Sequence, residues 1–104
     1  MNRELLFLKL LDLMTSPLNS GDSYPWHIES IKLYESGPMA MFRMPWRSSD
    51  PKHEASACMS LRWSPTGGFA LYAETCTMGR ETTNGMHALE NRLQRAKTTL
   101  KREL

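Results

Sequence analysis

The clearest pattern of hydrophobic and polar residues in the chain runs from Ala55 to Thr77 and predicts a β-hairpin. Every second residue is apolar in both arms: Ala55, Ala57, Met59, Leu61 and Trp63, then Phe69, Leu71 and Ala73. Strict alternation is the period of a strand with one buried face. A breaker segment, 64–68, separates the arms and sets the register. The expected pairs are Trp63 with Phe69, Leu61 with Leu71, and Met59 with Ala73.

A second hairpin is predicted from the segments 26–35 and 39–46, which are joined by a turn at 36–38. Pairing Leu33 with Ala40 would put Ile31 opposite Phe42, a favourable cross-strand match. Ala40, Phe42, Met44 and Trp46 share one face of the second segment, and Met39 and Met41 fall on the other face. We therefore expect both faces of this hairpin to be apolar.

Helices are predicted at both ends of the chain. Residues 2–14 are apolar over most of the helix circumference, so this helix must be covered on more than one side, by a second helix or by a partner. The last helix is expected from Met86 to about Arg102, with Asn84 as its cap. Its apolar residues recur at spacings of three and four, which predicts one stripe packed on the sheet or on the first helix: Met86, Leu89, Leu93, Ala96 and Leu100.

Together these elements predict a single α+β domain over residues 1–104 in the order α-β-β-β-β-α. Short hairpin connections favour an antiparallel sheet of three or four strands made of two hairpins, with the helices against one face. A chain of 104 residues has room for one core. The apolar run at the start is interrupted by Lys9 and Asp12 and is too short to span a membrane, so we expect a soluble, cytoplasmic protein.

Residue types that can carry out catalysis or bind metals are present, but they do not form any recognisable motif. The candidate metal ligands, His27, His53, His87, Cys58 and Cys76, do not have ligand spacing. The sequence has no nucleophile elbow, paired carboxylates or phosphate-binding glycine loop. We expect neither enzymatic activity nor a metal or cofactor. Cys58 and Cys76 are expected on one hairpin face, and two reduced thiols are favoured over a disulfide between them.

Binding to another protein is the function that the sequence favours. Eight methionines supply flexible apolar contacts, and aromatic residues near hairpin ends often anchor partners. The candidate contact residues are Met39, Met41, Trp26, Trp46, Tyr34, Leu89 and Leu93. We expect a small modulator or inhibitor, of the type that phages and plasmids encode, acting on a larger host machine such as a nucleic-acid enzyme. The expected partner is a different protein or a second copy of this chain.

Direct nucleic-acid binding is the alternative, because the charge is uneven along the chain. The net charge is +2, but residues 36–104 carry ten basic and six acidic side chains. The basic residues of the last helix could bind phosphates: Arg92, Arg95, Lys97, Lys101 and Arg102. This alternative requires Arg47, Lys52 and Arg80 to converge with them on one surface. The order of elements is similar in outline to that of a double-stranded RNA-binding domain, but has an extra strand and lacks the lysine cluster at the start of the last helix.

Overall fold

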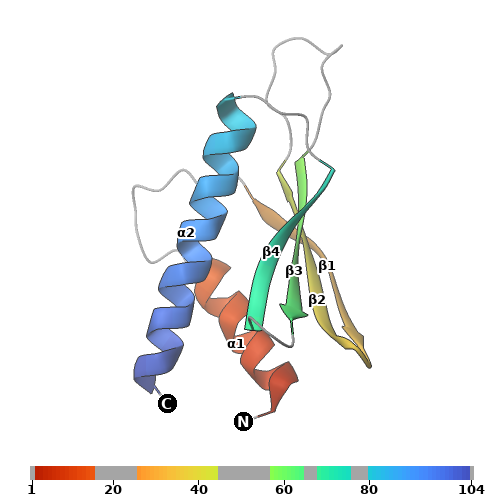
Figure 1. The fold of residues 1–104 in the computed structure, drawn as a ribbon, viewed down its shortest axis with the longest axis vertical. Helices are drawn as coiled ribbons and strands as arrows, with labels where there is room; N and C mark the ends of the chain where they lie inside the picture. Colours follow the sequence, from red (N-terminus) through yellow and green to blue (C-terminus); the bar gives the residue numbers. More distant parts are fainter. Residues whose placement is uncertain (1, 16–25, 45–56, 65–67, 76–79, 104) are drawn as a thin grey trace.

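The computed structural model describes residues 2–15, 26–44, 57–64, 68–75 and 80–103 (Figure 1). Their elements, in chain order, are α1 (Arg3–Thr15), β1 (His27–Tyr34), β2 (Gly37–Met44), β3 (Ala57–Ser64), β4 (Gly68–Thr75) and α2 (Arg80–Glu103). The predicted α-β-β-β-β-α order of an α+β protein is confirmed.

The four strands form one antiparallel sheet in the order β1-β2-β3-β4. Between β3 and β4, Trp63 pairs with Phe69, Leu61 with Leu71, and Met59 with Ala73, as predicted. The register shifts beyond Met59, so Cys58 pairs with Thr75. Cys58 is a buried free thiol, and Cys76 lies outside the described residues.

The predicted register between β1 and β2 is wrong by two residues. Leu33 pairs with Pro38 and Ile31 with Ala40, because the turn contains only Glu35 and Ser36. A shift of two preserves the strand faces, so Met39 and Met41 still project opposite to Phe42. The tight turn depends on Gly37, whose φ of +140° is rarely accessible to other residues. A Cβ there would lie 3.1 Å from the Cβ of Trp63.

The core lies between the two helices and one face of the sheet (Figure 1). The predicted stripe of α2 is confirmed as part of it: Leu89, Leu93, Ala96 and Leu100 are buried, and Met86 packs against them. From α1 the core receives Phe7, Leu10, Leu11 and Met14. The ring centroid of Phe7 lies 5.4 Å from that of Phe69, which ties α1 to the β3–β4 hairpin.

Helix α2 begins at Arg80, six residues before the predicted start, so Asn84 lies within the helix and does not cap it. The helix continues through Gly85, a residue with low helix propensity, because the sheet side requires a small residue there. A Cβ on Gly85 would lie 2.5 Å from the Sδ of Met44. The indole Nε1 of Trp26 donates a hydrogen bond of 2.7 Å to the Gly85 carbonyl. Tertiary packing therefore outweighs local propensity at this end of α2.

We predict that Gly37→Ala lowers the free energy of unfolding by about 1–3 kcal/mol, since it combines a strained φ with a contact against Trp63. Gly68→Asn is the matched control: Gly68 has a φ of +72°, but a Cβ added to it would meet no atom within 4 Å. Asparagine tolerates the left-handed region, so the control should lose less than about 1 kcal/mol. Urea unfolding followed by circular dichroism measures both variants. Equal losses would contradict the role given to the Trp63 contact.

Candidate functional site

Four large apolar side chains on α1 and β1 are exposed to solvent. Leu5 and Leu8 of α1 are 55% and 44% exposed, and Ile31 and Leu33 of β1 are 44% and 60% exposed. We call this set the α1–β1 surface. Single exposed leucines are ordinary on a protein surface, whereas a set of large exposed apolar side chains is more typical of a binding site.

The position of α1 explains why these four residues are uncovered. Helix α1 contacts α2 and β2. Leu6 and Leu10, on one flank of α1, line a cavity with residues of α2, β3 and β4. At 100° per residue, Leu8 falls on the other flank of α1, and Leu5 falls on the side of the helix that faces away from the core.

The β1 residues of the surface belong to the helix-covered side of the sheet. Ile31 and Leu33 pair directly with Ala40 and Pro38, which are both buried, and paired side chains project from the same face. Ile28, nearer the start of β1, packs against the core, whereas Ile31 and Leu33 are exposed. The core layer therefore continues, uncovered, to this edge of the sheet.

Strand β1 also has an open backbone edge. In the part of the chain that the structure describes, β1 pairs with β2 and with no other strand. A register shift lies between Ile28 and Ser30, and the pairing is regular from Ser30 to Tyr34. Edge strands pair readily with strands of other chains unless bulges or charges prevent it. The regular half of β1 is the half that carries Ile31 and Leu33.

The opposite face of the sheet carries a polar network on β3 and β4. Ser60, fully buried, donates a hydrogen bond of 2.6 Å to Glu74 and accepts one of 2.8 Å from the Nε of Arg62. Arg62 also forms an ion pair with Glu74, and its guanidinium lies 5.2 Å from the ring centroid of Tyr72. The charges of these residues are thus satisfied by one another.

A second ion pair lies on the neighbouring strands. The Nε of Arg43 donates a hydrogen bond of 2.9 Å to Glu29, and this bond, with the charge of the carboxylate, raises the pKa of Arg43. Met39 and Met41 lie on this sheet face, beside Arg62 and Ser60, and are half-buried. The predicted methionine surface is therefore interspersed with paired polar groups.

Three of the predicted protein-contact residues belong to the core. Leu89 and Leu93 are 0% and 1% exposed, and Trp26 is 4% exposed with its indole bonded to α2. Buried in this way, they stabilise the fold and offer no surface to a partner. Tyr34 is exposed at the end of β1, whereas Trp46 lies outside the described residues.

The basic residues of α2 are used in different ways. Arg92 donates a hydrogen bond of 2.9 Å to the carbonyl of Met14, at the last turn of α1. Arg95 and Arg102 are exposed, while Lys97 and Lys101 line the cavity. The predicted convergence with Arg47 and Lys52 falls outside the described residues, as does the side chain of Arg80.

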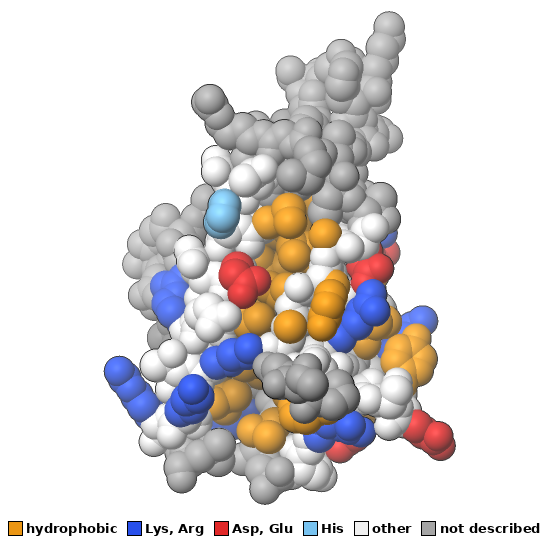
Figure 2. All heavy atoms as spheres, viewed as in Figure 1, with side chains coloured by type: hydrophobic (Ala, Val, Ile, Leu, Met, Phe, Trp, Pro, Cys, Tyr) orange, Lys and Arg blue, Asp and Glu red, His pale blue; other side chains and the backbone are white. Residues whose placement is uncertain are grey.

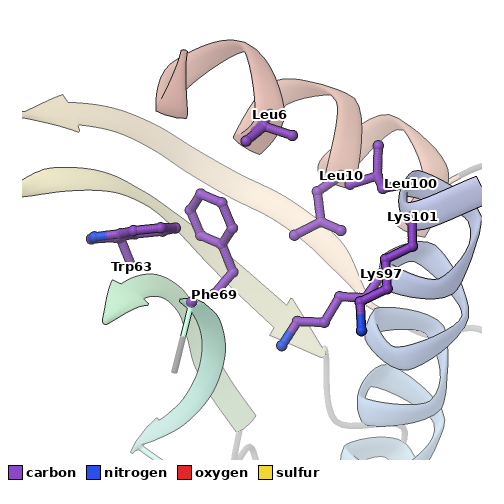
Figure 3. A pocket seen from close by; sticks show the side chains of 8 residues that line it. Leu6, Leu10, Trp63, Phe69, Lys97, Leu100 and Lys101 are labelled. Carbon is purple, nitrogen blue, oxygen red and sulfur yellow. The ribbon is translucent and has the colours of Figure 1, made fainter. Parts of the chain in front are cut away.

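The cavity was not predicted from the sequence. It has a volume of about 310 Å³ and is formed where α1, α2 and the β3–β4 hairpin meet (Figure 3). Figure 2 shows a band of hydrophobic side chains between α2 and β4, with Lys and Arg side chains gathered along its lower part. The sequence signal for this cavity was the pair Lys97 and Lys101, four residues apart. It indicates a binding site only when the positions of α1 and β4 beside α2 are known.

Over the described residues, no group of three or more His, Cys, Asp or Glu side chains could hold a metal ion. None of the described helices combines the length and the apolar character needed to cross a membrane. Comparison with protein-family models, curated protein sequences and solved structures finds no match. Any functional inference therefore depends on the geometry of the chain itself.

We predict that Trp26→Phe lowers the free energy of unfolding by about 1–3 kcal/mol, because it removes the hydrogen bond to Gly85 and leaves space beside Met44. Tyr34→Phe, at the exposed aromatic residue, should change it by less than about 0.5 kcal/mol. Thermal or urea unfolding of both variants checks the contrast. Unchanged stability of Trp26→Phe would contradict the structural role assigned to this indole.

Proposed function

We propose that the protein is a non-enzymatic modulator that binds another protein through the α1–β1 surface. The observation that carries the proposal is the exposure of Ile31 and Leu33 on β1, an edge strand of the sheet that the structure describes, together with that of Leu5 and Leu8 on α1. This region replaces the α2 stripe and Trp26 as the contact surface, since those residues are buried.

The partner contributes an extended segment that pairs with β1 and adds a fifth strand to the sheet. Main-chain hydrogen bonds along the edge provide affinity in this binding mode, and alternate side chains provide specificity. Side chains of the added strand that point to the helix side would pack against Leu8 and Leu33. They would extend the core layer over the uncovered edge and remove apolar surface from water.

Binding of this kind acts by occupying a segment of the partner, without a chemical step in this chain. It suits an inhibitor or modulator of a larger machine, such as a nucleic-acid enzyme. A second copy of the chain pairing edge to edge is the competing occupant, and it would give a symmetric dimer. A cytoplasmic location stays a prediction.

The experiment compares wild-type protein with Leu33→Asp and Leu8→Asp as baits in a lysate, after nuclease digestion and in high salt. Either variant should capture at least about tenfold less of a defined protein that the wild type retains, because binding would desolvate the charged aspartate in the contact. Ala73→Asp is the matched control: Ala73 is exposed, pairs with Met59 on the helix-covered side, and lies on the other edge strand.

Two outcomes would overturn the proposal. The first is equal capture by the wild type and both leucine variants, since binding would then not involve the α1–β1 surface. The second is recovery of nucleic acid alone, lost as the salt concentration rises, which would favour the basic residues of α2. Size-exclusion chromatography with light scattering identifies the remaining case: a dimer of the wild type that Leu33→Asp dissociates would assign the edge to a second copy.

A further inference from the structure

The cavity between α1, α2 and the β3–β4 hairpin combines an apolar interior with two cationic side chains. Its apolar lining consists of Leu6 and Leu10 of α1, Trp63 and Phe69 of the hairpin, and Leu100 of α2. Gly68, Lys97 and Lys101 also line it. No acidic residue is among the described residues that line it, so their charge is entirely positive.

The two rings of the cavity's aromatic wall pack against each other and against the core. The ring centroids of Trp63 and Phe69 lie 4.9 Å apart at an interplanar angle of 69°, an edge-to-face contact. Phe69 is also packed against Phe7, which is fully buried.

The two lysines reach the cavity from the same helix face. Lys97 and Lys101 are four residues apart, so their side chains are neighbours on α2. Figure 3 shows both side chains extending from α2 toward the space below Leu10, with Phe69 and Trp63 across the gap. Lys97 is half-buried and Lys101 exposed, which places the two ammonium groups near the mouth of the apolar space.

We propose that this cavity binds a single-chain amphiphile with an anionic head, such as a medium-chain fatty acid. The acyl chain would lie between the leucines of α1 and the aromatic wall, and the carboxylate would accept hydrogen bonds from Lys97 and Lys101. The volume of 310 Å³ is near the lower end of the range for ligand pockets, about 300–1,000 Å³. It suits one unbranched chain better than a fused-ring or two-chain ligand.

The charge of the lining argues for this ligand class over a neutral one. Lysine stems commonly cover apolar surface while their ammonium groups remain in water. A ligand with a terminal carboxylate would contact both parts of these side chains, whereas an uncharged chain would contact only the stems. This inference goes beyond the proposed function, since the cavity lies on the flank of α1 opposite to Leu8.

The test titrates the purified protein by isothermal titration calorimetry with decanoate, below its critical micelle concentration, and with decanol, below its aqueous solubility limit. The wild type should bind decanoate with a defined stoichiometry of one. The double variant Lys97→Gln/Lys101→Gln should weaken decanoate binding at least about tenfold, because two charge-assisted hydrogen bonds are lost. Its affinity for decanol should change less than about twofold, since the apolar contacts are retained.

Arg102→Gln is the matched control, because Arg102 is an exposed cation on α2 that does not line the cavity. It should leave decanoate binding unchanged. Leu6→Trp, which adds volume to the lining, should abolish binding of both ligands. The lysine variants keep the test decisive if Leu6→Trp fails to fold, since Lys97 and Lys101 lie outside the buried core.

Absence of decanoate binding by the wild type would overturn the proposal. So would equal weakening by Arg102→Gln and by the lysine variant, which would indicate a general attraction to positive charge. Leu33→Asp should bind decanoate like the wild type, so failure of this proposal is distinguishable from failure of the proposed protein contact.

Discussion

The packing of α1 between α2 and β2 is the contact on which most of the structure depends. Phe7 and Met14 are fully buried, and Arg92 of α2 holds the carbonyl of Met14. A sheet with one apolar face needs helices to cover it, and in this fold α1 and α2 are packed against each other as they do so. The position of α1 determines which apolar groups remain accessible on either side of it.

The two flanks of α1 have different surroundings and suit different ligands. On the flank toward α2, leucines and aromatic rings border a small, open apolar space, and the charged residues described along it are lysines. Away from α2, Leu5 and Leu8 of α1 are exposed, as are Ile31 and Leu33 on the edge strand β1 of the described sheet. The first is shaped for a narrow chain with a charged end, and the second for a flat segment of polypeptide. One helix thus separates two chemically distinct surfaces.

Features set by local periodicity could be predicted from the sequence, and those set by tertiary fit could not. Alternation in 55–77 was enough to define the pairing of Trp63 with Phe69. The β1–β2 register was predicted wrongly because a few residues, including Gly37, determine the length of the turn. The requirement for glycine at this position is seen only in the structure, where Gly37 lies against Trp63. The surplus apolar surface of residues 2–14 was expected, but which leucines were exposed depended on the crossing of α1 over the sheet. Predicting the cavity would also have required knowing how α1 crosses the sheet.

The hydrogen bond from Arg92 to the Met14 carbonyl joins residues 78 positions apart in the chain. Helix α1 is therefore synthesised before α2, the helix that packs against it. Contacts between residues far apart in the sequence slow folding. Apolar segments that are exposed before their packing partner is made favour aggregation or capture by chaperones. The order of elements along the chain makes α1 dependent on α2, so α2 must be synthesised before the core can close.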